Sequence, residues 1–126
     1  MKIPLLTLFI SLFVISCGSV TDVPFSEDIV SMAPPTINRV DPASPIRGDK
    51  VVIYGFGFSI VPENNFVSFG NNVAVGEKYE IPANPTAIEL EAITFTVPEN
   101  ATTGVQNIVV TTGENTSNAN VVITIN

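Results

Sequence analysis

From residue 36 onward, apolar and polar residues alternate in short runs, and this period of two does most to limit the possible fold. In Ile88–Val97, the apolar side chains of Ile93, Phe95 and Val97 alternate with two threonines. Successive side chains of a β-strand point to opposite faces, so such a run can bury one face. Turn residues separate the runs every 8–12 residues or so. The pattern predicts strands at 36–41, 50–55, 66–70, 88–97, 105–112 and 120–125, and a weaker one at 73–75 whose continuation to Glu80 stays open.

Seven strands in about 90 residues are typical of an immunoglobulin-like β-sandwich, so the predicted fold class is all-β. The chain has one cysteine and no tryptophan, so the core must be built from valine, isoleucine and phenylalanine. Gly55 and Gly57 let the backbone bend, and Phe58 after them is predicted to plug the core. Pro42 and Pro98 are predicted to mark strand ends, because proline cannot donate a hydrogen bond to a sheet.

The same region carries motifs in a fixed order. The stretch "PTINRVDPASPIRGDKVVIYGFGF" has a proline, an apolar strand, a proline turn, a glycine turn, a second apolar strand and a Gly-x-x-Phe step. The stretches "VSFG" and "ITFTVPENATTGVQNIVVTT" follow. With these motifs, residues 34–126 resemble the IPT/TIG domain family, which implies an immunoglobulin-like sandwich. The matching positions are Pro35, Ile37, Val40, Pro42, Gly48, Val51, Ile53, Gly55, Phe58 and Val67–Gly70.

The first residues, "MKIPLLTLFISLFVIS", place one positive charge before the apolar run Ile3–Ile15. These 13 residues are too few for the hydrocarbon core of a bilayer, which needs about 20, but they suit the apolar part of a signal peptide. The following Val14-Ile15-Ser16-Cys17 resembles the lipobox of bacterial lipoproteins. That resemblance implies cleavage before Cys17 and attachment of lipid, palmitate included, to Cys17. An ordinary secretory peptide with an incidental cysteine is the alternative.

Three segments therefore make up the predicted organisation. Residues 1–16 are the lipoprotein signal peptide, 17–35 are the lipidated Cys17 with a flexible linker, and 36–126 are the IPT/TIG domain. Two or more acyl chains at Cys17 would hold the protein stably on a membrane. Gly18, and not aspartate, follows the cysteine, which by resemblance to enterobacterial sorting implies the outer membrane. The leaflet that the protein faces stays open.

Charge and composition argue against several classes of function. The chain has twelve acidic and five basic residues, no histidine and a net charge of −7. An acidic chain lacks the basic surface that binds nucleic acid. Without histidine or a catalytic motif we expect no enzyme and no cofactor. No Cys/His spacing indicates a metal site, although calcium binding by the Asn/Glu-containing loops stays open.

Aromatic side chains that the core does not require are the candidates for contact with a ligand or partner. Phe56 and Tyr79 are the best exposed of these. The sequence as a whole predicts a non-catalytic, lipid-anchored envelope protein whose domain binds a partner protein or serves as a spacer. The alternative is a carbohydrate-binding accessory lipoprotein of a polysaccharide-uptake system, with a glycan as its ligand.

Overall fold

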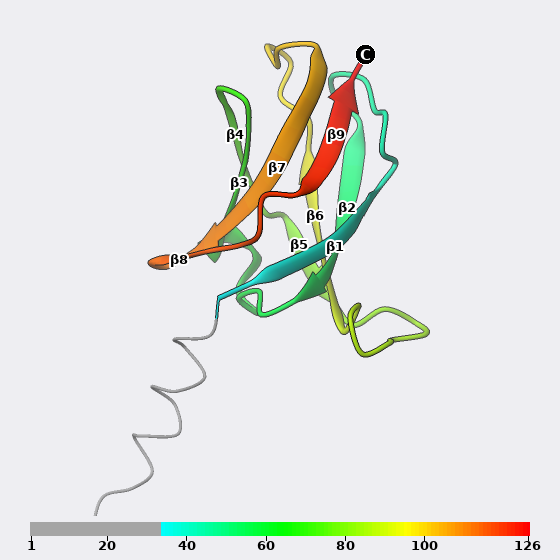
Figure 1. Ribbon diagram of the computed structural model, residues 1–126, viewed down its shortest axis with the longest axis vertical. Helices are drawn as coiled ribbons and strands as arrows, with labels where there is room; N and C mark the ends of the chain where they lie inside the picture. The colour runs from blue at the N-terminus through cyan, green and yellow to red at the C-terminus, as the bar shows by residue number, and fades with distance from the viewer. Residues whose placement is uncertain (1–33) are drawn as a thin grey trace, which may run out of the picture. The chain divides into compact units, whose positions relative to one another are not determined.

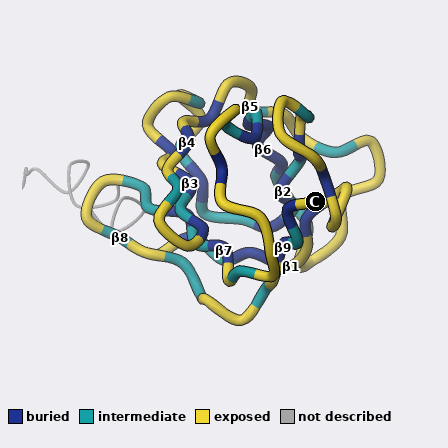
Figure 2. The backbone as a smooth tube through the Cα atoms, turned by 90° about the horizontal axis from the view of Figure 1, so that it is seen from above, coloured by how far each residue is buried: buried dark blue, intermediate teal, exposed yellow. Residues whose placement is uncertain are grey.

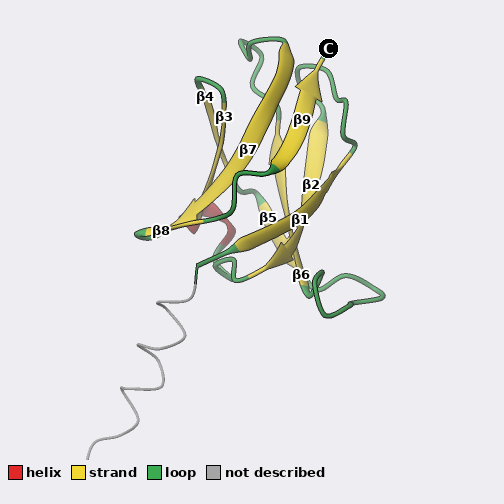
Figure 3. Ribbon diagram, viewed as in Figure 1, coloured by secondary structure: helices red, strands yellow, loops and turns green. Residues whose placement is uncertain are grey.

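Two antiparallel β-sheets pack face to face in the computed structural model, which describes residues 34–126 (Figures 1 and 3). The four-stranded sheet has the order β1-β2-β6-β5, formed by Thr36–Asp41, Lys50–Phe56, Glu91–Thr96 and Lys78–Glu80. The five-stranded sheet runs β4-β3-β7, formed by Asn72–Val75, Asn65–Phe69 and Gly104–Thr112, and both β8 (Asn115–Thr116) and β9 (Val121–Ile125) pair with β7. The 3-10 turn η2 (Pro62–Asn64) precedes β3. The predicted all-β, immunoglobulin-like sandwich is confirmed.

The core lies between the sheets and takes alternate residues from the long strands (Figure 2). The rings of Phe69 and Phe95, one from each sheet, have centroids 5.8 Å apart and are tilted by 45°, an arrangement that aromatic pairs favour. Phe58 is 6% exposed and packs in the same cluster, as predicted. Each fully buried aliphatic or aromatic side chain contributes about 1.5–3 kcal/mol. The other large core residues are Ile37, Val51, Ile53, Val67, Ile93, Val97, Ile108, Val110, Ile123 and Ile125.

The predicted strand bounds are nearly correct for most strands, and two proline predictions are confirmed. Strand β1 has the predicted bounds and Pro42 follows it, while Pro98 comes two residues after β6. One bound is off by several residues. Strand β6 begins at Glu91 and not at residue 88, because Thr86 and Glu89 bond each other's backbone in a turn. The two-residue strand β8 is not among the predicted strands.

The weaker strand at 73–75 does not continue to Glu80, a point that the sequence leaves open, because the chain changes sheets at Gly76. Strand β4 belongs to one sheet and β5 to the other. Gly76 N donates to Asn65 O at 2.9 Å, and the next amide, Glu77 N, donates to Thr94 O at 2.7 Å. A Cβ atom on Gly76 would lie 2.4 Å from the carbonyl oxygen of Pro62. Only glycine lets the backbone pass so close to η2, so the sheet change is fixed by this residue.

Backbone hydrogen bonds also protect the outer edge of β9. Thr124 N donates to Ala43 O at 2.9 Å and Asn126 N donates to Pro45 O at 3.0 Å. These bonds tie the last strand to the segment that follows β1. Exposed strand edges tend to pair with other chains, and covering an edge in this way prevents it. The C-terminus lies at the upper end of the sandwich in Figure 1, and β1 begins at the lower end.

Candidate functional site

The outer face of the five-stranded sheet is the most unusual surface of the described domain. Inward positions of its strands fill the core, so the alternate positions must point to solvent. The outer face of an antiparallel sheet is normally polar, but here it is largely aliphatic and none of its residues carries a charge. We call this surface the neutral face. It consists of Phe66, Ser68, Val73, Val75, Val105, Asn107, Val109, Thr111, Val122 and Thr124.

Cross-strand pairing brings some apolar side chains of the neutral face together. Phe66 of β3 lies opposite Val75 of β4, whereas Val122 of β9 lies opposite the polar Asn107 of β7. Val105, at the start of β7, is 70% exposed. These side chains are not covered by any other part of residues 34–126. Contiguous exposed apolar surface of this kind usually marks an interaction site.

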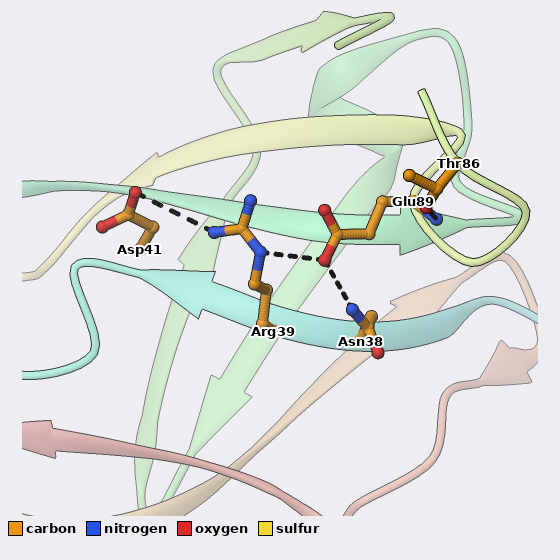
Figure 4. A network of polar contacts seen from close by, with 5 residues as sticks. All are labelled: Asn38, Arg39, Asp41, Thr86 and Glu89. Carbon is orange, nitrogen blue, oxygen red and sulfur yellow. Dashed lines mark hydrogen bonds and ion pairs between the residues drawn. The ribbon is translucent and has the colours of Figure 1, made fainter. Parts of the chain in front are cut away.

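Charged side chains concentrate instead on the four-stranded sheet, where they pair with one another. Arg39 Nε donates to Glu89 Oε2 at 2.8 Å, and Asn38 Nδ2 donates to the same carboxylate (Figure 4). The Arg39 guanidinium also lies 4.0 Å from the centre of the Tyr54 ring. The hydrogen bond from Arg39 lowers the pKa of Glu89. This sheet therefore satisfies its charges internally, whereas the other presents none.

A second ion pair on that sheet reaches from the first residue of β2 to Glu77, just before β5, with β6 between the two strands. Lys50 Nζ lies 2.8 Å from Glu77 Oε1 and donates to Thr96 Oγ1 at 2.9 Å. The hydrogen bond from Lys50 lowers the pKa of Glu77. Lys78 and Glu80 form a further pair, at 3.2 Å. Exposed pairs of this type contribute little to stability, about 0–1 kcal/mol each, but they leave few unpaired cations to attract an anionic ligand.

The two predicted contact residues are half-buried and lie on opposite faces of the four-stranded sheet. Phe56 is the last residue of β2, opposite Thr36, and it follows the outward-facing alternation of that strand. Tyr79 of β5 points inward and packs against the core. Burial, followed by a hydrogen bond with Glu91, raises the pKa of Tyr79 to about 12. The structure does not bring Phe56 and Tyr79 together, and neither is as exposed as predicted. Cys17, the predicted lipidation site, lies outside the described residues.

Sequence reasoning overlooked the neutral face because it considered only the inward positions of each strand. The signal was nevertheless present. The outward positions of 66–68, 73–75, 105–111 and 122–124 contain no Asp, Glu, Lys or Arg. Phe66 is 46% exposed, although the sequence leads us to expect phenylalanine in the core.

Within residues 34–126 no group of three or more acidic or cysteine side chains is placed to hold a metal ion. The same part of the chain has no helix long and apolar enough to cross a membrane. The fold and this surface together define an immunoglobulin-like β-sandwich module. The IPT/TIG domain family matches residues 35–125, and the chain belongs to that family.

Comparison with solved structures gives the same fold. The gamma-CGTase of an alkalophilic Bacillus clarkii is similar, with a TM-score of 0.58 and 28% identity over 75% of this chain. The SGBP-B of the Bacteroides ovatus mixed-linkage glucan utilization locus, solved with a mixed-linkage heptasaccharide, has a TM-score of 0.53 and 16% identity over 73% of this chain. The chain spans only 12% and 22% of the lengths of these two proteins. No curated protein sequence matches it.

Proposed function

We propose that this protein is a non-catalytic, lipid-anchored component of the cell envelope whose sandwich binds a partner protein through the neutral face. The anchor is the lipid on Cys17, for which the Val14-Ile15-Ser16-Cys17 motif is the support. The outer membrane, suggested by Gly18, is the proposed location. The observation that carries the binding role is a sheet face without charge on a chain whose net charge is −7.

The partner should present an uncharged, largely aliphatic surface to the neutral face. The centres of protein interfaces are poor in charged residues and rich in aromatic anchors, and Phe66 beside Val75 provides such an anchor. A charged partner surface would lose its hydration against these side chains without gaining an ion pair. The acidic residues elsewhere would disfavour other orientations of an acidic partner.

Carbohydrate binding is the second candidate, supported by the fold shared with SGBP-B, whose structure contains a heptasaccharide. Sugar rings stack on exposed aromatic faces. In residues 34–126 Tyr54 has Arg39 over its ring, Tyr79 packs on the core, and Phe56 is half-buried. Phe66 is the one large aromatic side chain in the described domain that is more than a third exposed. The scarcity of exposed aromatic side chains therefore favours a protein partner over a glycan.

Photo-crosslinking from the neutral face, in membranes that contain the lipidated protein, tests the proposal. A photoreactive residue at Val105 or Val122 should capture one partner, and the same residue at Glu80, on the other sheet, should not. Phe66→Glu should abolish capture, whereas Lys78→Gln, which changes the net charge by the same amount, should leave it intact. A partner that Phe66→Glu still captures would contradict the proposal. Glycan-array binding lost in Phe66→Glu, Phe56→Ala or Tyr79→Ala would favour the second candidate.

The anchor has its own test. Mass spectrometry of the wild-type protein should show acyl chains on Cys17, and Cys17→Ser should lose that mass and leave the membrane fraction. A Cys17→Ser protein that stays fully membrane-bound would contradict lipid anchoring without affecting the assignment of the neutral face.

A further inference from the structure

Two loops at one end of the sandwich expose five aliphatic side chains that the core does not use. The first loop, between β2 and η2, exposes Ile60 and Val61, which are 73% and 42% exposed. The second, between β5 and β6, exposes Ile81, Ile88 and Leu90, which are 59%, 55% and 47% exposed. We call these five residues the apolar end. Single exposed aliphatic residues are common, but five of them on two loops at the same end of the domain are unusual.

The apolar end lies where the described chain begins. A Cβ atom on Gly57, just before the first loop, would lie 2.9 Å from the carbonyl oxygen of Pro34. Phe58 N donates to Glu91 Oε1 at 3.0 Å, which joins the first loop to the end of the second. Both loops are at the lower end of the sandwich in Figure 1, where β1 begins, and the C-terminus is at the upper end.

The second loop also carries no charge between its flanking ion pairs. Residues 81–88 include no charged side chain. The acids that flank them are engaged, because Glu80 pairs with Lys78 and Glu89 pairs with Arg39. Glu91 is held by the amide of Phe58. The surface that projects from this end is therefore aliphatic and neutral, apart from Glu63 in η2, which is exposed.

We propose that the apolar end inserts shallowly into the surface of the bilayer that carries the lipid anchor. The proposal rests on the anchoring of Cys17 proposed above. Sixteen residues separate Cys17 from Pro34, and a flexible linker of that length has a relaxed reach of about 20–25 Å. Such a tether holds the domain at a high effective concentration near the membrane, so loops with weak affinity can still insert. Aliphatic side chains at loop tips gain from transfer into the headgroup–acyl boundary.

The preferred surface is zwitterionic. Glu63 and the acidic balance of the domain would be repelled by anionic headgroups. The proposal therefore commits to a bilayer rich in phosphatidylethanolamine or phosphatidylcholine. With the apolar end on the membrane, the neutral face would stand to one side and stay open to a protein partner.

An environment-sensitive fluorophore on a single introduced cysteine tests the proposal. In the lipidated protein Cys17 is blocked, so Ile88→Cys or Ile60→Cys supplies the one reactive thiol. Val105→Cys, at the other end and 70% exposed, is the matched control. Each labelled, lipidated protein is reconstituted onto phosphatidylcholine vesicles, and binding is first verified by flotation. All three positions are exposed, and an unchanged melting temperature verifies that each variant is folded.

On these vesicles the fluorophore at residues 88 and 60 should shift to the blue, and a lipid-borne quencher should quench it at least twofold more than at residue 105. Adding phosphatidylglycerol should reduce the difference. Equal quenching at all three positions in protein that floats with the vesicles would overturn the proposal and leave the anchor intact. Protein that carries no acyl mass and does not float would overturn the anchor, and the insertion of the loops with it.

Discussion

The side-chain amide of Asn118 binds both backbone groups of Ile37, 81 residues away in the sequence. Asn118 Oδ1 accepts from Ile37 N at 2.7 Å, and Asn118 Nδ2 donates to Ile37 O at 2.9 Å. The side chain thus makes the two backbone hydrogen bonds that a residue of a neighbouring strand would make. It lies between β8 and β9 and satisfies the edge of β1 in the opposite sheet, so it joins the two sheets along one side.

Replacement of Asn118 by alanine should therefore lower the free energy of unfolding by about 1–3 kcal/mol, because two polar groups of nearly buried Ile37 lose their partners. Urea unfolding of the soluble Cys17→Ser protein measures this change. Asn84→Ala, in the exposed 81–90 loop, is the control and should change stability by less than about 0.5 kcal/mol. Equal stability of the two variants would show that the amide contributes nothing across the sheets.

Replacement of a second asparagine, Asn65, should lower the free energy of unfolding more than replacement of its neighbour Asn64. Asn65 is fully buried and its amide bonds Ser59, Pro62 and Thr112, which holds the loop before β3 in place. Asn64 is exposed. We expect Asn65→Ala to lower the free energy of unfolding by about 2–4 kcal/mol and Asn64→Ala to have a small effect. Matching melting temperatures for these two variants would contradict the assigned role of Asn65.

These asparagines show where sequence reasoning reaches its limit. Alternation located the strands and the core because burial depends on local period. The partners of Asn65 and Asn118 depend on which segments meet in three dimensions, and asparagine is equally expected in turns. The neutral face is an intermediate case. Its composition was readable from alternate residues, but the adjacency of β4, β3, β7 and β9 required the topology. The sheet change at Gly76 likewise depends on the close approach of Pro62.

The two phenylalanines of β3 should separate core packing from surface function. Phe69→Ala removes a fully buried ring that packs on Phe95 and should lower the free energy of unfolding by about 3–5 kcal/mol. Phe66→Ala removes a ring from the neutral face and should cost less than about 1 kcal/mol. Thermal unfolding of both variants tests this difference. A large loss of stability in Phe66→Ala would mean that Phe66 supports the fold and is not available for a partner.

Glu89 should make a small contribution to stability that disappears in acid. Its folded pKa lies below the ordinary value of 4.5 because of the hydrogen bond from Arg39. A lowered carboxyl pKa stabilises the fold above the unfolded pKa, and the effect is lost as the pH falls through the folded pKa. Between pH 5 and about pH 3, the melting temperature of Glu89→Gln should therefore fall less than that of the wild type. The pair is partly exposed, so the effect should stay below about 1 kcal/mol.

The control for this titration is Asn84→Ala, which changes the exposed 81–90 loop and removes no carboxylate. It should leave the acid dependence of the melting temperature close to that of the wild type. Raising the salt concentration should diminish the contribution of Glu89, because exposed ion pairs are screened. If Glu89→Gln and Asn84→Ala have identical profiles between pH 5 and pH 3, the Arg39–Glu89 bond has no energetic role in solution.

Tyr79 provides a probe of the core in alkali, because burial raises its pKa from 10.0 to about 12. The chain has two tyrosines, so in Tyr54→Phe the absorbance of tyrosinate reports Tyr79 alone. We expect its midpoint near pH 12 as long as circular dichroism shows the native sheet.

A raised phenol pKa favours the protonated, folded form, so this stabilisation is complete below pH 10 and is lost as the pH rises to about 12. Tyr79→Phe should remove that part of the alkaline unfolding. A midpoint near 10 in native protein would mean that Tyr79 is solvated, which would restore it as an exposed aromatic for a ligand.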